Sequence, residues 1–289
     1  MVSVIITNYN NSLYIPECLD SVFSQEGVDL ECIVVDDCST DNSVEVLSSY
    51  TEKYSNLILV KKQNNEGCGK GRCTGLEYAN GEYVIFLDSD DYYTHPHYLK
   101  ALVDKAKATN SDIVRSGYTD PGGEHIEHLD GVFSDRQERV NIMLDAWGKA
   151  ITSICNTLYS GEIWKKTYYS DRPCVEDTPS HIRALMLANQ IAYVEDYGYY
   201  YRPNPNSITH NLYPAKYQLF NVLCVLDCIE TCKPYGVKFI SDEHGAYVDF
   251  TLNVLLLGLT RESFKKYEKY YDELISKFDK LGYDTKMFQ

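Results

Sequence analysis

Short apolar runs rich in β-branched residues alternate with amphipathic stretches over residues 1–117 of the chain. The amphipathic stretches place apolar side chains three and four positions apart, as helices do. This pattern predicts strands at 2–7, 31–37, 57–61, 83–87 and 112–116, and helices at 13–25, 41–54 (capped by Asp41), 67–80 and 96–109. Strands separated by helices of this length predict right-handed βαβ units, hence an α/β fold with a mostly parallel sheet flanked by helices.

Polar clusters follow three of the predicted strands. Thr7-Asn8-Tyr9-Asn10 follows the first strand, Asp36-Asp37 the second, and Asp88-Ser89-Asp90-Asp91 the fourth. In open parallel sheets, ligands bind beyond the carboxyl ends of the strands. We therefore expect one ligand site at this edge of the sheet.

The rest of the chain follows a different pattern. Residues 118–135 contain the turn signal Asp120-Pro121-Gly122-Gly123 and predict a hairpin or loop. Residues 136–212 mix helix and strand, and helical patterns follow at 214–232, 243–259 and 262–281. We interpret residues 1–212 as one domain and 213–289 as a helical C-terminal appendage.

The charge balance excludes some classes of partner. The 289 residues include 27 Lys and Arg against 42 Asp and Glu, a net charge of −15. A sequence-independent nucleic-acid binder, or a polybasic membrane-binding surface, needs the opposite sign. An anionic substrate must therefore be bound by a local device, such as a metal ion, a few basic side chains or backbone N–H groups.

Cysteine usage and the lack of long apolar runs predict a cytoplasmic protein. No run approaches the length of a membrane span, and Val2–Ile6 is too short for the core of a signal peptide. The ten cysteines form no CxxC pair, so we expect reduced thiols. Cys224, Cys228 and Cys232 share one helical face, which indicates burial, with a metal or cluster site as the alternative.

The acidic cluster Asp88-Ser89-Asp90-Asp91 is the strongest local signal. Three carboxylates in four positions repel one another unless a cation lies among them. Hard divalent ions such as Mg²⁺ or Mn²⁺ prefer carboxylate oxygens and share their coordination sphere with substrate phosphates. The alternative is an acidic turn that caps the next helix.

Two further segments lie close to this edge. Asp36-Asp37 either accepts hydrogen bonds from a nucleoside or caps the following helix. The glycine-rich segment 64–72 fits neither the phosphate-loop nor the dinucleotide-binding pattern. Its glycines permit close backbone approach, and Arg72 supplies a positive charge there, unless the segment is simply a helix start with a surface arginine.

Two later segments also carry candidate chemistry. Glu176-Asp177 begins an amphipathic run, so the pair either stabilises a first helical turn or presents a general base, with Arg183 orienting or neutralising one member. The aromatic strand ending at Arg202 is followed by Ser207-Ile208-Thr209-His210. This part is either an edge strand and loop, or a segment that closes over phosphate with His210 as a metal ligand.

The motifs occur in a characteristic order, namely residues 2–10, 34–41, 65–67, Arg72, 83–91 and 176–177. This ordered set resembles the family 2 glycosyltransferases of bacterial surface-polysaccharide synthesis. The resemblance covers residues 1–212. It implies the GT-A fold, with a nucleotide-binding half at 1–117 and an acceptor half at 118–212, a nucleotide-sugar donor, a divalent metal (Mn²⁺ or Mg²⁺) and inversion at the anomeric carbon.

The resemblance also implies site residues at the matching positions. The donor-binding residues are Thr7, Asn8 and Tyr9 along the nucleoside, Asp37 at the base, Arg72 near the base or diphosphate, Asp88 at the ribose with Ser89 beside it, and Arg202 and Ser207 near the phosphates. Asp90 holds the metal, with His210 as the second candidate ligand. Asp177 is the catalytic base, with Glu176 beside it.

The implied reaction is a single displacement that moves a sugar from a UDP-sugar to a hydroxyl of a glycan or lipid-linked acceptor. Two other functions remain open: a nucleotidyltransferase that makes a nucleotide sugar, and a non-catalytic nucleotide-sugar-binding protein. The chain lacks a Lys/Arg-dense glycine loop near its N-terminus, which disfavours the first. The apolar stretch 248–259 predicts a helix packed on the catalytic domain, and the alternative is that the C-terminal helices contact the acceptor, a second copy of the chain or the inner face of the cell membrane.

Overall fold

The computed structural model describes residues 1–125, 131–145, 154–170, 172, 175–205, 214–239 and 268–281. The chain divides into two compact units, Met1–Asn204 and Pro205–Gln289. The predicted boundary between residues 212 and 213 lies outside the described residues.

An eight-stranded, mostly parallel sheet forms the core of the first unit, as predicted, with the strand order β3-β2-β1-β4-β10-β6-β11-β9. Its strands are β1 (Val2–Asn8), β2 (Leu30–Asp36), β3 (Leu57–Lys61), β4 (Tyr83–Asp88), β6 (Ile113–Ser116), β9 (Gly131–Phe133), β10 (Thr157–Ser160) and β11 (Ile191–Val194). The predicted alternation of strands and helices over residues 1–117 is confirmed.

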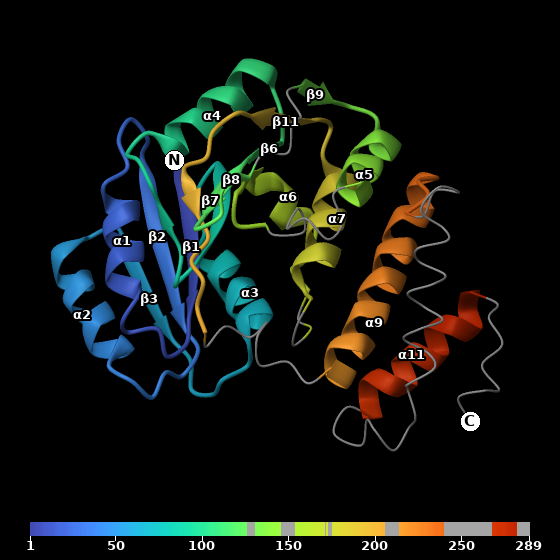
Figure 1. Cartoon of the computed structure of the whole chain (residues 1–289), viewed down its shortest axis with the longest axis horizontal. Coiled ribbons are helices and arrows are strands. Elements are labelled where there is room, and N and C mark those ends of the chain that lie inside the picture. Colours follow the sequence, from blue (N-terminus) through green and yellow to red (C-terminus); the bar gives the residue numbers. More distant parts are fainter. Residues whose placement is uncertain are drawn as a thin grey trace. The chain divides into compact units, whose positions relative to one another are not determined.

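Helices cover both faces of the first four parallel strands. Figure 1 shows α1 (Ile15–Phe23) and α2 (Ser43–Lys53) on one side of β1–β3 and α3 (Cys68–Tyr78) on the other. A strand covered on both faces reads as a continuous apolar run. Accordingly Val4, Ile5 and Ile6 of β1 are fully buried. A further helix, α4 (Tyr98–Thr109), connects to β6.

Strands from both predicted halves of the first unit interleave in the sheet. β10 lies between β4 and β6 and pairs with both in antiparallel fashion, with Leu158 opposite Ile85 and Val114. β9 is the other antiparallel strand and pairs with β11 at the edge. The sheet that carries β4 is therefore complete only when residues 157–160 have joined it.

A smaller sheet has the order β5-β12-β7-β8 and consists of β5 (Tyr92–Tyr93), β12 (Tyr199–Tyr200), β7 (Tyr118–Asp120) and β8 (Gly123–His125). The predicted hairpin is present, because β7 and β8 pair in antiparallel fashion with Asp120 opposite Gly123. The rings of Tyr92 and Tyr200 stack with centroids 4.7 Å apart. This sheet joins the segment after β4 to the segment that follows β11.

One detail of the helix starts differs from the prediction. Helix α2 begins at Ser43 with Asn42 at the cap position, where Asp41 was expected. The Asp41 carboxylate instead accepts the backbone N–H groups of Ser12 and Ser43, at 2.9 Å each. Asp41 therefore joins the loop after β1 to the start of α2, and the cap position moves by one residue.

The described residues between β9 and β11 form the helices α5 (Arg136–Asp145), α6 (Gly161–Lys166) and α7 (Asp177–Leu187). A buried arginine joins α5 to α7. All five N–H groups of the Arg139 guanidinium donate to backbone carbonyls, those of Phe133, Ser134, Leu185, Ala188 and Asn189. Three of these carbonyls are at the carboxyl end of α7, where a positive charge is favourable.

The described part of the second unit contains two helices, α9 (Pro214–Cys232) and α11 (Glu268–Leu281), and the 3₁₀ turn η1 (Lys233–Tyr235). Cys224, Cys228 and Cys232 are buried in α9, as predicted. Lys277 of α11 pairs with Asp227 of α9 at 3.0 Å. The helix predicted at 243–259 lies outside the described residues.

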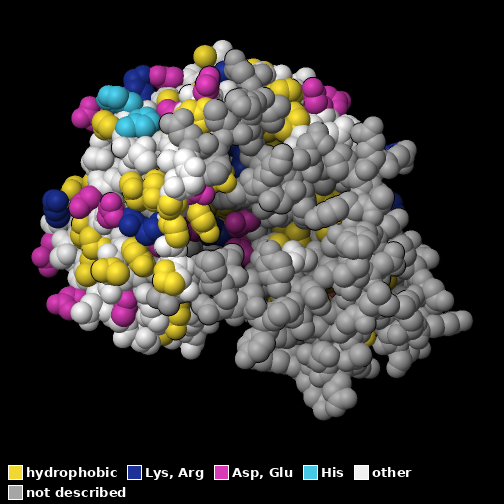
Figure 2. Space-filling model, in the orientation of Figure 1, with side chains coloured by type: hydrophobic (Ala, Val, Ile, Leu, Met, Phe, Trp, Pro, Cys, Tyr) yellow, Lys and Arg dark blue, Asp and Glu magenta, His cyan; other side chains and the backbone are white. Residues whose placement is uncertain are grey.

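Surface properties add two observations. None of the helices within the described ranges is long and apolar enough to cross a membrane. On the face of the first unit shown in Figure 2, acidic and basic side chains are interspersed with hydrophobic ones. The predicted dimer or membrane contact of the C-terminal helices stays a prediction.

We expect Arg139→Met to lower the free energy of unfolding by about 3 kcal/mol, because it leaves several buried carbonyls without a donor. Urea unfolding of the full chain measures this. Arg136→Met is the matched control, since the half-buried Arg136 donates to the Met186 carbonyl at 2.9 Å and should cost only about 1 kcal/mol. Equal losses in the two variants would contradict the capping role of Arg139.

Candidate active site

The carboxyl ends of β1, β2 and β4 meet at one edge of the sheet, as the polar clusters predicted. In the strand register, Thr7 is opposite Asp88 and Asn8 is opposite Asp36. The three clusters are thus neighbours in space although they come from separate parts of the sequence. This edge is the candidate active site.

The β1 and β2 clusters are bound to each other. Asn8 is buried, and its Nδ2 donates to Asp36 Oδ2 at 2.8 Å. Asp36 also accepts the backbone N–H of Ser39 at 2.9 Å. Tyr9, the next predicted donor residue, is 45% exposed. The side chains of Asn8 and Asp36 thus shape the floor of this edge, whereas the Tyr9 ring is available to a ligand.

Asp37 holds the glycine-rich segment in place. Its carboxylate accepts the backbone N–H groups of Glu66 at 3.0 Å and Gly67 at 2.6 Å, and it pairs with Lys62 at 3.1 Å. Gly67, at the cap position of α3, has φ of 90°, which favours glycine. The structure therefore places Asp37 in a buried cluster that sets the start of α3.

Helix α3 packs very closely against its neighbours because glycines face them. A Cβ atom on Gly69 would be 2.5 Å from the carbonyl oxygen of Ser170, and one on Gly71 would be 2.8 Å from Thr7 Cγ2. The predicted donor residue Thr7 therefore contacts the α3 backbone. This close packing places Arg72, the residue that follows Gly71 in α3, in the interior of the protein.

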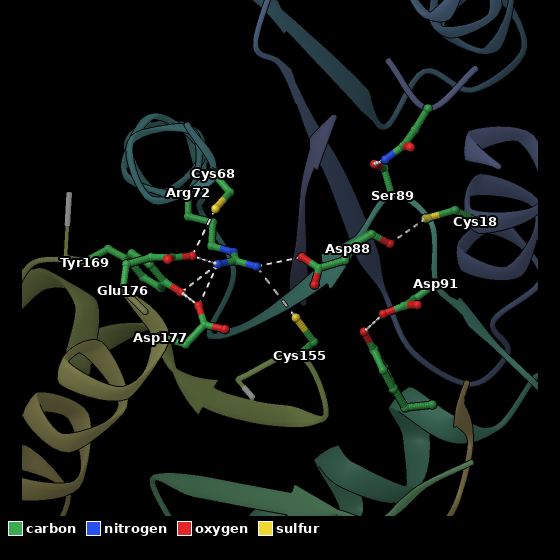
Figure 3. A network of polar contacts seen from close by, with 12 residues as sticks. Cys18, Cys68, Arg72, Asp88, Ser89, Asp91, Cys155, Tyr169, Glu176 and Asp177 are labelled. Carbon is green, nitrogen blue, oxygen red and sulfur yellow. Dashed lines mark hydrogen bonds and ion pairs between the residues drawn. The ribbon is translucent and has the colours of Figure 1, made fainter. Parts of the chain in front are cut away.

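Arg72 connects three acidic residues from distant parts of the chain (Figure 3). Its Nη2 lies 2.6 Å from Asp88 Oδ1, and its Nη1 lies 2.6 Å from Asp177 Oδ1 and 2.8 Å from Glu176 Oε1. Arg72 is only 3% exposed, so these ion pairs form away from bulk water. The structure thus brings three predicted site residues together around the guanidinium of a fourth, Arg72.

Arg72, and not Arg183, is the cation that meets the Glu176-Asp177 pair. The guanidinium of Arg183 lies over the ring of Tyr168, 4.3 Å from its centroid. Arg183 lies six positions after Asp177, which places these two side chains on different sides of the helix. Arg72 forms the ion pairs with both acids, so the prediction that Arg183 orients or neutralises one member of the pair is wrong.

Asp177 begins helix α7, and Glu176 occupies the cap position before it. The Glu176 side chain does not cap the helix; its carboxylate accepts hydrogen bonds from Arg72 and from the Cys68 thiol, at 2.8 and 3.0 Å. Burial, with the negative charges of Glu176 and Asp88, raises the pKa of Asp177 to about 7 even though Arg72 opposes the shift. A carboxyl with this pKa can exchange a proton near neutral pH.

Each of the three residues that follow β4 has its own hydrogen-bond partners. Ser89 is buried and its hydroxyl accepts from Asn11 Nδ2 at 2.8 Å. Asp90 Oδ2 accepts from Asn204 Nδ2 at 2.8 Å. Asp91 accepts the backbone N–H of Arg202 at 2.8 Å and the hydroxyl of Tyr199. Hydrogen bonds from the 199–204 segment thus stabilise two acids of the cluster.

Arg202 lies directly beside the Asp90 loop. Its Nε donates to the Asp90 carbonyl at 2.7 Å, and its Nη2 pairs with Glu17 at 2.5 Å. The guanidinium also lies over the rings of Tyr14 and Tyr92, at 5.3 and 5.0 Å from their centroids. The two remaining predicted residues, Ser207 and His210, lie outside the described residues.

The chemistry around Asp90 fits a divalent cation. Burial and the neighbouring charge of Asp88 raise the pKa of Asp90, so a positive charge here would be favourable. Mg²⁺ and Mn²⁺ bind carboxylate oxygens and are commonly held by one or two carboxylates with substrate phosphates. Among the described residues, no three His, Cys, Asp or Glu side chains are arranged to hold a metal alone.

Several residues of the site were not predicted from the sequence. Tyr169 contacts both Arg72 and Asp177, Lys62 pairs with Asp37, and Asn204 holds Asp90. Tyr169 and Asn204 belong to no motif, and each contacts a partner about a hundred positions away, so local patterning offers no signal for them. Lys62 could have been predicted as a site residue, since it follows β3 at the same edge of the sheet.

Comparison with curated proteins finds glycosyltransferases of several bacteria. Uncharacterized glycosyltransferase EpsJ of Bacillus subtilis is 27% identical over 72% of this chain and 63% of its own length. Poly(ribitol-phosphate) beta-glucosyltransferase of Bacillus spizizenii is 28% identical over 95% of this chain and 44% of its own length. TarS of Staphylococcus aureus, a poly(ribitol-phosphate) beta-N-acetylglucosaminyltransferase, is 29% identical over 69% and 35%. The chain thus spans less than two thirds of each of these relatives.

Solved structures with the same fold include TarS residues 1–349 in complex with UDP-GlcNAc, with a TM-score of 0.68 at 23% identity over 96% of this chain and 80% of that one. Glucosyl-3-phosphoglycerate synthase of Mycobacterium tuberculosis, in complex with Mn²⁺, UDP and glucosyl-3-phosphoglycerate, has a TM-score of 0.53 at 19% identity over 82% and 80%. Both are GT-A glycosyltransferases, so the predicted GT-A fold is confirmed.

The sequence model of one family, described as "Glycosyl transferase family 2", matches residues 3–166, which is more than half of the chain. The match includes β1, β2, the glycine-rich segment and the acidic cluster after β4. With the fold and the relatives, it confirms the resemblance noted from the motifs. The chain belongs to glycosyl transferase family 2.

Proposed function

We propose that this chain transfers a sugar from a UDP-sugar to a hydroxyl group of a glycan or lipid-linked acceptor, with inversion at the anomeric carbon. The observation that carries the proposal is the placement of Asp88 and Asp177 around Arg72, with one carboxylate oxygen of each 2.6 Å from the guanidinium. A donor-binding acid and a candidate base thus lie on either side of one cation, where a donor and an acceptor would meet.

The donor end of the site is the edge formed by β1, β2 and β4. Asp88, whose side chain is 37% exposed, keeps an oxygen available to a ribose hydroxyl beside its ion pair with Arg72. Tyr9 offers an exposed ring to the nucleoside. Asp37 acts by holding the Glu66–Gly67 backbone beside this edge, since that backbone occupies its carboxylate.

The chemical step uses Asp177 as general base. The acceptor oxygen attacks the anomeric carbon, its proton passes to Asp177, and the bond from the anomeric carbon to the diphosphate oxygen breaks with its electron pair leaving on the nucleoside diphosphate. A positioned base of this kind contributes about 10²–10⁴-fold. Holding donor and acceptor together contributes through orientation.

A divalent cation belongs at Asp90 in this proposal. When bound, such an ion neutralises charge that develops on the leaving diphosphate. Asn204 orients the Asp90 carboxylate for this task, through the 2.8 Å hydrogen bond to its Oδ2. The Mn²⁺ in the M. tuberculosis synthase and in a Pyrobaculum calidifontis mannosyltransferase, which shares the fold with a TM-score of 0.59, supports this choice of ion.

The acceptor is proposed from the relatives. Two of them are named for sugar transfer to poly(ribitol-phosphate), a polymer whose ribitol units carry hydroxyl groups. The nucleotidyltransferase alternative differs in its product, since it releases pyrophosphate where a glycosyltransferase releases nucleoside diphosphate. Family membership favours the glycosyltransferase.

Asp177→Asn should lower the rate of sugar transfer at least a hundredfold while donor binding is retained, because the amide cannot accept the proton. Release of nucleoside diphosphate measures the rate, and calorimetry measures the binding. Asp104→Asn, which removes an exposed carboxylate of α4, is the control and should keep full activity. Near-normal turnover by Asp177→Asn would remove Asp177 from this role.

The transfer rate should rise with pH through an acid limb centred near 7, because Asp177 acts in its ionised form and its pKa is about 7. A kcat profile between pH 5 and 9 under saturating substrates measures this limb. A rate that stays constant down to pH 5, where an ordinary carboxyl is still largely ionised, would contradict the assignment.

Asp90→Asn should abolish the gain in donor affinity that Mn²⁺ provides, a loss of at least about tenfold, since the cation loses its charged ligand. Calorimetry with UDP, with and without Mn²⁺, measures this gain. Asp104→Asn should keep the full Mn²⁺ effect. An Asp90→Asn chain that still binds UDP more tightly with Mn²⁺ would exclude Asp90 as the metal ligand.

A further inference from the structure

Within the described part of the chain, the carboxylate of Asp177 is held through one of its two oxygens. Arg72 Nη1 and the hydroxyl of Tyr169 both contact Oδ1. Among the described residues, Oδ2 receives no hydrogen bond, and Figure 3 shows it directed away from Arg72 and Tyr169. Protein donors therefore occupy Oδ1, whereas Oδ2 is open to a proton from a bound substrate.

The direction of the Tyr169 hydrogen bond follows from its partners. Arg72 Nη1 donates to the Tyr169 hydroxyl oxygen at 2.9 Å, because a guanidinium has donors only. The single hydroxyl proton of Tyr169 then points to Asp177 Oδ1. Burial raises the pKa of Tyr169 well above its usual value, so the phenol keeps this proton throughout the working range of the enzyme.

The ring of Tyr169 is fixed by its surroundings. The side chain is 1% exposed and packs against Phe86 and Trp164, with ring centroids at 5.3 and 5.8 Å. Its neighbour in the chain, Tyr168, is 64% exposed. Because the Tyr169 ring cannot rotate away without opening the core, its hydroxyl is a rigid donor.

We propose that Tyr169 is a positioning residue for the base: by donating to Oδ1 of Asp177 it fixes the carboxylate and reserves Oδ2 for the proton taken from the acceptor. This inference rests on the proposed role of Asp177 as general base. A proton on Oδ1 would meet two donors, so the acidic proton resides on Oδ2. Removing the Tyr169 hydroxyl releases the carboxylate to rotate and weakens its ionised form.

Other charged and titratable groups also face Asp177. They are Arg72 from α3, Asp88 from β4, the adjacent Glu176, and the thiols of Cys68 and Cys155. The substitution Tyr169→Phe alters none of them and keeps the aromatic ring. A change in the titration of Asp177 in this variant therefore reports the hydroxyl itself.

The test compares Tyr169→Phe with Tyr159→Phe in the full chain. Tyr159 is equally buried, packs on Trp164 with ring centroids 5.2 Å apart, and its hydroxyl forms a 2.7 Å hydrogen bond with His181 Nδ1, so it controls for loss of a buried hydroxyl in the same aromatic cluster. In Tyr169→Phe the acid limb of kcat should move up by about half a unit or more, with about a threefold loss of kcat below pH 6.5 and an unchanged UDP affinity. Tyr159→Phe should keep the wild-type limb.

A second substitution moves the limb in the opposite direction. Replacing Tyr169 with 3,5-difluorotyrosine makes the hydroxyl a stronger donor, so the acid limb should move to lower pH. A merely structural role of Tyr169 would change stability and leave the limb in place for both replacements. An unmoved limb in both would overturn the proposal.

The Asp177→Asn background separates this proposal from the proposed function. If Asp177 is the base, Tyr169→Phe should cause no further loss in Asp177→Asn, because the two residues act as a unit. If Asp177→Asn is nearly as active as wild type, the proposed function itself fails. If Asp177→Asn is inactive while Tyr169→Phe keeps the wild-type limb and rate, only the role of Tyr169 fails.

Discussion

The ion pairs of one buried guanidinium organise this active site. Removing Arg72 from water costs several kcal/mol, and the contacts to Asp88, Glu176 and Asp177 offset that cost. Without the cation, these three carboxylates would repel one another and the ends of β4 and α7 would separate. The distance between Asp88 and Asp177, the proposed donor-binding acid and the proposed base, is therefore set by a single side chain of α3.

The position of that side chain depends in turn on backbone packing. Gly69 and Gly71 allow α3 to contact the Ser170 carbonyl and Thr7 directly, so the helix axis lies closer to the sheet than larger residues would permit. Asp37 fixes the first turn of the helix through the Gly67 N–H. Features that concern only the backbone thus determine where the charge of Arg72 lies.

Much of the fold could be predicted from the sequence because its signals are local. An apolar run that ends in acids, as β4 ends at Asp88, indicates a buried parallel strand whose end faces a ligand. The contacts that complete the site are non-local. Tyr169 and Arg72 are separated by 97 positions, and Asp91 reaches Tyr199 across 108. Local patterning grouped Asp91 with a cation site, whereas the tertiary fold gives it hydrogen bonds from the 199–202 segment.

The insertion of β10 between β4 and β6 has a consequence for how the protein is made. On the ribosome, β1 to β4 emerge first and can pair, but the outer edge of β4 stays open until Thr157–Ser160 appears. An unpaired strand edge is a template for aggregation, so the nascent chain passes through a vulnerable interval. Asp177 emerges shortly after Thr157–Ser160, so the proposed base joins the site only once the vulnerable edge has been covered.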